Sequence, residues 1–192
     1  MKNIKLIVGL ANPIIKYDKT RHNVGSWFIQ RLACYHNQDL KMSRKFLGYI
    51  GSFIYCDFKT YLFIPNTFMN LSGKSISVVL KFYRIRLDEI LVVHDELDLN
   101  PGLVRFKLGC GHNGHNGIRN IIDVLAKRNN FLRIQIGIGR PDKLKQIADF
   151  VLSSPTLEEK LLIETSILRA IKMTNLLIKE RNTLIEKKVL NQ

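Results

Sequence analysis

The chain has 192 residues, of which 46% are hydrophobic and 24% are charged, a composition that fits one globular domain and excludes a disordered chain. No run of about 18 apolar residues is present, so we expect neither a membrane span nor a membrane partner. Thirty Lys and Arg against sixteen Asp and Glu give a net charge of +14, which favours nucleic acid as the partner, because phosphates release counterions when basic groups bind them.

The basic excess also has a simpler explanation, since Lys is abundant here together with Asn and Ile and this bias implies no partner. Its distribution favours a function. Residues 1–60 carry ten basic and three acidic side chains, residues 61–155 thirteen and eight, and residues 156–192 seven and five. The excess therefore avoids the C-terminal segment and lies where the unusual motifs are.

The cysteines and the N-terminus indicate the compartment. Cys34, Cys56 and Cys110 are an odd number without metal-like spacing, which favours free thiols over a disulfide framework. The apolar start of the chain leads into Asn12-Pro13 rather than a small-residue cleavage site, so it reads as a buried strand and not as an export signal. Both observations predict a reducing compartment, the cytoplasm.

Hydrophobic periodicity predicts strands alternating with helices. Strands are expected over 5–8, 46–55, 59–64, 89–93, 103–108 and 131–138, the second and third forming a hairpin. Helices are expected over 24–33, after 70–72, over 117–125, and from a start at 154–159 to about 188. This alternation predicts an α/β fold: a twisted, mixed, largely parallel sheet flanked by helices, in a single domain over 1–192 with a C-terminal helix at 155–190 packed on it.

Polar residues at the ends of two predicted strands indicate where a site forms. Asn12 follows the first buried strand and Asp95 follows the strand at 89–93. If the strands are parallel, both side chains emerge at one edge of the sheet, where sites of such folds lie. Taken singly, a turn explains Asn12 and a strand-end cap explains Asp95.

Three further segments carry polar residues at junctions. His22 precedes the first helix, where Thr20 or Asn23 would suffice as a cap, so the histidine is surplus to capping. Asn70 marks a strand-to-helix junction. The segment 109–117 holds four glycines and two histidines; it is either a mobile hairpin loop or a backbone that lets a ligand approach, with its amides free.

Together these residues suggest hydrolysis of an ester or amide. A neutral histidine deprotonates water when a carboxylate holds its tautomer, and asparagine amides stabilise an oxyanion without net charge. No G-x-S-x-G elbow is present, so a covalent intermediate is not indicated. His112 and His115 form an H-x-x-H pair, but without H-E-x-x-H or a cysteine pair we expect no metal.

Several segments, in this order, resemble the bacterial-type peptidyl-tRNA hydrolase family. The matching blocks are KLIVGLANP, YxxTRHN, PxTFMNLSGK, ILVxHDELDL, GHNGI and RIQIGIGRP, and the match continues into FVL at 150–152. They cover roughly residues 3–155, and the C-terminal helix is compatible with the family. Six ordered blocks of this length are far more specific than a lone glycine motif.

The resemblance implies an enzyme that hydrolyses the ester of peptidyl-tRNA, as a monomer without cofactor or metal. It implies His22 as general base, Asp95 as the carboxylate that orients it, and Asn12 as the residue that senses the peptide bond. It further implies contacts with the peptide and the tRNA 3′ end from Asn70 and Asn116, a cleft lined by Met69 and His115, aromatic positions beside the terminal nucleotides at Tyr17 and Phe68, and a phosphate contact from Lys107.

The chain departs from the family pattern at Ile14, Cys110 and Asn113, which stand in place of glycines, and at Gln135, where many members carry an arginine that holds phosphate with the lysine. Two other functions stay open on the sequence. One is a non-catalytic relative of the same fold that binds structured RNA, which would tolerate loss of His22 or Asp95. The other is an unrelated peptidase or esterase, which the basic surface disfavours.

Overall fold

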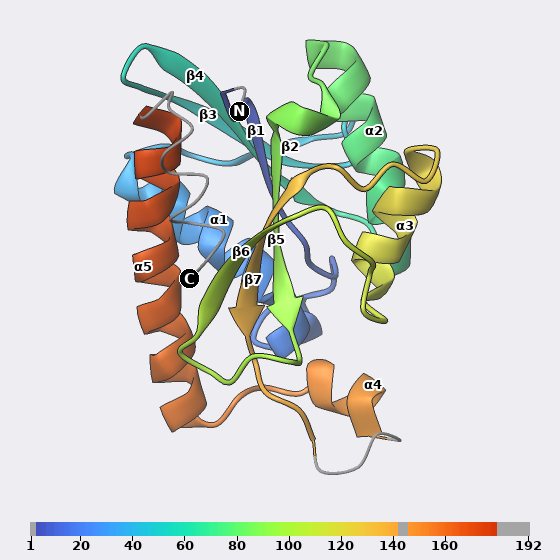
Figure 1. Ribbon diagram of the computed structural model, residues 1–192, viewed down its shortest axis with the longest axis vertical. Helices are drawn as coiled ribbons and strands as arrows, with labels where there is room; N and C mark the ends of the chain where they lie inside the picture. The colour runs from blue at the N-terminus through green and yellow to red at the C-terminus, as the bar shows by residue number, and fades with distance from the viewer. Residues whose placement is uncertain (1–2, 142–145, 180–192) are drawn as a thin grey trace.

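The computed structural model describes residues 3–141 and 146–179. Within them, seven strands form one sheet in the order β2-β3-β4-β1-β5-β7-β6 (Figure 1). Neighbours among β4, β1, β5 and β7 pair in parallel, and β2, β3 and β6 run antiparallel to their neighbours. The strands are β1 (Leu6–Gly9), β2 (Lys41–Ser43), β3 (Gly48–Tyr55), β4 (Phe58–Pro65), β5 (Ile90–Glu96), β6 (Val104–Leu108) and β7 (Leu132–Gly137).

Helices cover both faces of the sheet (Figure 1). One core cluster joins Ile7 of β1 to α1 and α5, and the other joins Val8 to α2 and α3, because successive strand residues point to opposite faces. The helices are α1 (Val24–Tyr35), α2 (Ser72–Tyr83), α3 (Asn116–Val124), α4 (Ile147–Val151) and α5 (Leu157–Lys179), with short 3₁₀ turns η1 (Ile15–Tyr17), η2 (Arg21–Asn23), η3 (Met69–Leu71) and η4 (Leu87–Glu89). None of the helices described here is long and apolar enough to cross a membrane.

The predicted α/β class with a mixed, largely parallel sheet is confirmed. The predicted end of one strand was wrong: β5 does not end at Val93 but continues through His94, Asp95 and Glu96, all buried. Asp95 therefore lies within the strand and not after it. The sheet partner β7 supplies hydrogen bonds along this extension, pairing Asp95 with Ile136. Neither the short edge strand β2 nor α4 was predicted, and the part of the predicted last helix beyond 179 lies outside the described residues.

Two glycines allow α1 to lie directly on the sheet. A Cβ atom added to Gly25 of α1 would lie 2.5 Å from the carbonyl oxygen of Val93, and one added to Gly9 would lie 2.1 Å from the carbonyl oxygen of Gly25. Any larger residue would push the helix away from β1 and β5. This close packing places η2, which directly precedes α1, beside the carboxyl end of β5.

Candidate active site

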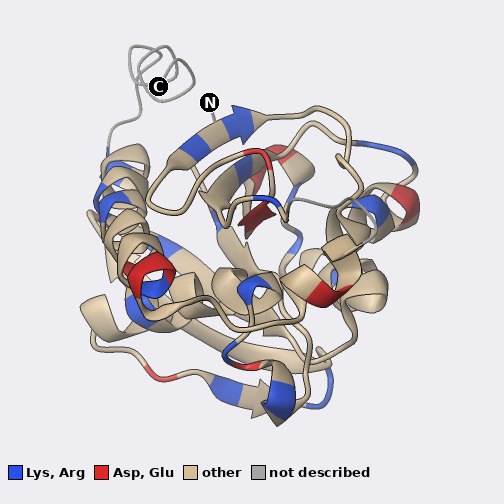
Figure 2. Cartoon of the chain, turned by 90° about the horizontal axis from the view of Figure 1, so that it is seen from below, with Lys and Arg blue, Asp and Glu red and all other residues tan. Residues whose placement is uncertain are grey.

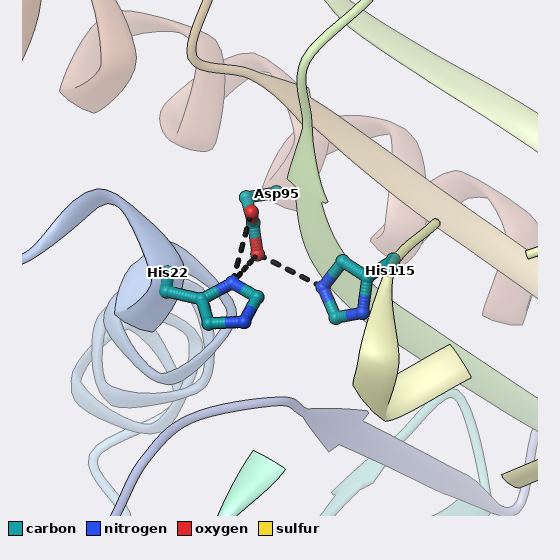
Figure 3. Close-up of side chains that lie close together, drawn as sticks. All are labelled: His22, Asp95 and His115. Carbon is teal, nitrogen blue, oxygen red and sulfur yellow. Dashed lines mark hydrogen bonds and ion pairs between the residues drawn. The ribbon is translucent and has the colours of Figure 1, made fainter. Parts of the chain in front are cut away.

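The carboxylate of Asp95 is the centre of the site. It lies on β5, is only 3% exposed, and receives hydrogen bonds from two histidines that belong to different helical segments (Figure 3). Nδ1 of His22, on η2, lies 2.9 Å from Oδ1 and 3.0 Å from Oδ2. Because a neutral imidazole carries one proton, donation from Nδ1 leaves the lone pair on Nε2 of His22, the atom that a general base needs.

His115 approaches the same carboxylate from the other side (Figure 3). Its Nε2 lies 2.9 Å from Oδ1 of Asp95. Its Nδ1 accepts hydrogen bonds from the backbone amides of Gly117 and Ile118, so the side chain caps the N-terminus of α3. Two donors at Nδ1 require a lone pair there, so the proton of the neutral ring is on Nε2 and points at Asp95.

Electrostatics in this group favours a negative Asp95. Burial raises the pKa of the Asp95 carboxyl, but the charges and hydrogen bonds of His22 and His115 outweigh it and hold that pKa well below its usual range. Burial likewise lowers the pKa of His22, yet the charge and hydrogen bond of Asp95 raise it above the ordinary value of 6.5. The carboxylate therefore stabilises the imidazolium that forms when His22 takes a proton.

His94 lies next to this group but has a different character. It is 2% exposed, and its Nδ1 donates to the backbone oxygen of Asp95 at 2.6 Å. Burial, helped by the charge of His115, lowers the pKa of His94 to about 3. A pKa this low makes the His94 imidazole a much weaker base than His22, so His94 is not suited to take a proton from water at physiological pH.

Asn12 is held in place by backbone contacts. Its Oδ1 accepts a hydrogen bond from the amide of Met69 at 3.0 Å, which leaves its Nδ2 hydrogens as the free donors of the side chain. Asn23, the residue after His22, accepts from the Asn12 amide at 2.9 Å and donates to its carbonyl at 3.1 Å. Asn23 stands at the start of α1 but makes no side-chain cap there, because its amide group is committed to the Asn12 loop.

A pocket of about 320 Å³ adjoins Asn12. Its wall is rich in amide and apolar groups and contains no Lys or Arg, a lining suited to peptide rather than phosphate. The residues around it are Ala11, Asn12, Pro13, Ile15, Asp18, Asn23, Ser26, Gln30, Leu40, Tyr49, Ile64, Pro65 and Asn66.

The other predicted site residues divide by position. Met69 is buried and its sulfur packs against Gly117, next to His115. Phe68 and Asn70 flank Met69 and are exposed, as is Asn116, the residue after His115. Tyr17 is half-buried at the end of η1. Lys107 is half-buried on β6, which β7 separates from β5, so it lies apart from His22 and Asp95.

The glycine-rich loop is held by its carbonyls. Arg133, 1% exposed, donates from Nη1 to the oxygen of Gly111 and from Nη2 to that of Cys110, both at 2.8 Å. Cys110 and Asn113, which the resemblance sets at positions of glycine, have φ angles of +74° and +46°. They thus keep the left-handed backbone of glycine at a cost in strain. The buried guanidinium of Arg133 thus anchors the first part of this loop through two of its carbonyls.

Gln135 lies under the surface, contrary to what its place in a phosphate contact suggests. It is 2% exposed, its Oε1 accepts from Nε of Arg105 at 2.8 Å, and its Nε2 donates to Glu96. In the sheet, Lys107 is paired with Arg133 and Arg105 with Gln135. The basic groups on this face of β6 are the half-buried Arg105 and Lys107, and a phosphate between positions 107 and 135 would have no access to the buried glutamine.

Basic residues are not confined to one element. In the view from below, Lys and Arg occur on strands, helices and loops, with fewer Asp and Glu between them (Figure 2). As regards metals, His22, Asp95 and His115 each offer a ligand atom within 4.8 Å of the others. Both histidines are engaged in hydrogen bonds to Asp95 through one ring nitrogen each, and a metal ion bound at those nitrogens would have to replace these bonds.

A buried carboxylate paired with a histidine at the carboxyl ends of parallel strands is an arrangement that suits a hydrolase, because such a histidine can act as a general base. The sequence matches the peptidyl-tRNA hydrolase family over residues 6–192, and the chain belongs to that family. The comparisons give no support to a non-catalytic RNA-binding relative or to an unrelated peptidase or esterase.

Individual relatives are similar in sequence over all or nearly all of this chain. The peptidyl-tRNA hydrolase of Buchnera aphidicola subsp. Baizongia pistaciae is 54% identical over 192 residues, covering 100% of this chain and 93% of the relative. That of Pectobacterium atrosepticum is 49% identical over 180 residues, 94% and 92% of the two chains. The crystal structure of peptidyl-tRNA hydrolase from Acinetobacter baumannii superimposes with a TM-score of 0.92 at 40% identity, over 100% of this chain and 94% of that one.

Sequence reasoning missed the parts that hold this site together. Asn23 was considered only as a helix cap, and Arg21 and Arg133 appeared only as letters of the matching blocks. The signal available was weak: three polar residues in succession, Arg21, His22 and Asn23, before an amphipathic helix, where one cap is enough.

Proposed function

We propose that this chain hydrolyses the ester bond between the peptide and the tRNA of peptidyl-tRNA, with a water molecule that His22 activates. The observation that carries the proposal is the hydrogen bond from Nδ1 of His22 to Asp95, which leaves Nε2 as the base. Membership of the family supplies the substrate, and the histidine–carboxylate pair supplies the chemistry.

The reaction follows from the protonation states. Nε2 of His22 takes a proton from water as the water oxygen attacks the ester carbonyl, and the resulting imidazolium is stabilised by Asp95. The tetrahedral intermediate carries an oxyanion, for which the amides of Asn12, Asn70 and Asn116 are neutral donors. When the intermediate collapses, the carbon–oxygen bond to the ribose breaks, and the proton on His22 passes to the ribose oxygen. Peptide and reusable tRNA leave.

Recognition is divided between peptide and tRNA. Nδ2 of Asn12, the half of the amide not held by Met69, donates to the peptide bond of the substrate, which an unblocked aminoacyl-tRNA lacks. Tyr17 and Phe68 contact the terminal nucleotides, the exposed Phe68 ring offering a stacking surface. Lys107 contacts a phosphate of the tRNA.

The proposal needs one chain and no metal. His22, Asp95 and His115 all belong to one chain, so the proposed site needs no residue from a second subunit, and we propose a monomer in which residues 1–192 form one catalytic domain. Because Asp95 accepts from both histidines, the carboxylate acts through hydrogen bonds, and the mechanism contains no metal step. We assign the chain to the cytoplasm, where the exposed free thiols Cys34, Cys56 and Cys110 stay reduced.

The test is release of peptide from N-blocked aminoacyl-tRNA, compared with the unblocked form, in the presence of a chelator. Wild-type protein is expected to cleave the blocked substrate with or without chelator. His22→Ala is expected to lose activity by about 10²–10⁴-fold while tRNA binding persists, since only base catalysis is removed. Full activity of His22→Ala would refute the mechanism, and loss of wild-type activity in chelator would refute its independence of metal.

A further inference from the structure

We propose that Arg21 is a positioning residue for His22, and that the junction between α4 and α5 thereby fixes the geometry of the active site. The inference rests on the proposed role of His22 as general base. It gives the segment 150–159 a function in the reaction, although this segment lies far from His22 in the sequence. None of the interactions described above joins the segment directly to His22, Asp95 or His115.

Arg21 is buried, with 5% of the residue exposed, and its side chain reaches the α4–α5 junction. Nη1 lies 2.7 Å from Oγ of Ser153 and 2.9 Å from the carbonyl oxygen of Ser154, with longer contacts to the carbonyls of Ser153 and Phe150. Nη2 forms an ion pair with Oε2 of Glu159 at 2.7 Å. The backbone amide of Arg21 also donates to the Ser153 carbonyl, at 3.1 Å.

This arrangement suits a guanidinium and no other cation. A buried charge requires several partners at once, and the planar fork of arginine supplies donors in two directions. Phe150 lies in the last turn of α4 and Ser153 follows the C-cap residue Leu152, so both carbonyls stand at a helix C-terminus, where a cation is favourable. Glu159 neutralises the charge and accepts from the amide of Thr156 at the start of α5. One residue thus joins the end of one helix to the start of the next.

His22 lies between two fixed neighbours on the three-residue turn η2. On one side Arg21 is attached to the α4–α5 junction, and on the other side Asn23 is attached to the backbone of Asn12. A turn of this length cannot shift at one residue without moving the others. The 2.9 Å contact between His22 and Asp95 therefore depends on both attachments, and a displacement of about 1 Å is enough to cost up to about 100-fold in rate.

A second arginine provides a matched control. Arg31 of α1 also pairs with a glutamate of α5, its Nε lying 3.1 Å from Oε2 of Glu164, but its side chain is 55% exposed and lies on the part of α1 remote from η2. Arg21→Lys and Arg31→Lys make the same chemical change in ion pairs to the same helix. Only the first removes an attachment of the turn that carries His22.

The experiment compares these two variants and Glu159→Gln with wild type. We measure kcat and KM on N-blocked aminoacyl-tRNA at a temperature where circular dichroism shows each protein folded, together with the proton NMR signal of the Nδ1–H of His22, assigned by its loss in His22→Ala. Arg21→Lys is expected to lower kcat by about 10- to 100-fold with KM nearly unchanged, and to broaden that signal by faster exchange. Arg31→Lys is expected to keep wild-type kcat and an unchanged signal.

Glu159→Gln keeps the acceptor for the Thr156 amide but removes the negative charge opposite Arg21, so we expect a smaller fall in kcat than in Arg21→Lys. If Arg21→Lys does not fold, the comparison of Glu159→Gln with wild type tests the inference. Wild-type kcat and an unchanged His22 signal in a folded Arg21→Lys or Glu159→Gln protein, even with a lower Tm, would overturn the inference and leave Arg21 a purely structural residue. An active His22→Ala protein would instead refute the proposed function, so the two failures are distinct.

Discussion

Nε2 of His115 lies 2.9 Å from Oδ1 of Asp95, the oxygen that Nδ1 of His22 also contacts. The carboxylate is thus oriented from both sides, by His22 in the turn η2 before α1 and by His115, the N-cap residue of α3. Because Nδ1 of His115 accepts from the helix amides, the α3 N-terminus itself determines which nitrogen of His115 carries the proton. The orientation of Asp95 is therefore coupled to the formation of α3.

His115 has two separable contributions, and two substitutions distinguish them. His115→Ser keeps a residue that caps helices well but removes the donor to Asp95, whereas His115→Ala removes both. We expect a similar fall in kcat in the two variants, with His115→Ser more stable than His115→Ala by about 1 kcal/mol in the free energy of unfolding. Urea unfolding and initial rates measure these quantities. Wild-type kcat in His115→Ser would mean that the contact with Asp95 has no part in catalysis.

The pH dependence of the reaction reports on His22. A general base acts only when neutral, and Asp95 raises the pKa of His22 above 6.5 despite burial, so kcat/KM is expected to rise with pH through a pKa above that value. In Asp95→Asn the raising charge is gone and burial alone remains, which lowers the pKa of His22. The rise of kcat/KM with pH should then occur at lower pH. The plateau value of kcat/KM should also fall, but by less than in His22→Ala. If kcat/KM of Asp95→Asn rises over the same pH range as in wild type, the titrating group is not His22.

Asn12 is expected to separate peptidyl from aminoacyl substrates. Asn12→Asp keeps the oxygen that accepts from Met69 but replaces the free donor with a carboxylate, which repels a peptide carbonyl and attracts the free amine of an unblocked substrate. The preference for N-blocked aminoacyl-tRNA should narrow by roughly 1–3 kcal/mol. Competition between the two substrates measures the ratio of kcat/KM values, and an unchanged ratio would place the sensor at another residue.

The salt dependence of tRNA binding tests the basic groups on β6. Lys107→Ala and Arg105→Gln are each expected to lower the log–log slope by about one unit, if each neutralises one phosphate. Gln135→Arg is expected to leave the slope unchanged, because position 135 is buried against Glu96 and Arg105. Binding of tRNA titrated from low to moderate salt measures all three. A steeper slope in Gln135→Arg would mean that this side chain reaches the phosphate after all.

Much of the molecule was predictable because local patterns carry it. Continuous apolar runs such as 89–93 predict buried strands, and the helical spacing of Ile163, Ile167 and Ile171 predicts the inner face of α5, where all three are buried. Parallel pairing of β1 with β5 then brings Asn12 and Asp95 to one edge of the sheet, as the order of elements suggested. Neither the short β2 nor α4 was predicted, because few residues give too little periodicity.

By itself the sequence determined the class of fold, the edge of the sheet where the site forms and the residue types gathered there, since these depend on side-chain periodicity and on the order of strands. Only the tertiary structure decided which nitrogen of each histidine faces Asp95, that Gln135 is buried, and that Arg21 joins η2 to Ser153, Ser154 and Glu159. The physical reason is the range of the contacts: these hydrogen bonds join residues 20 to 138 positions apart in the sequence, so they depend on how strands and helices pack, and no local pattern records them.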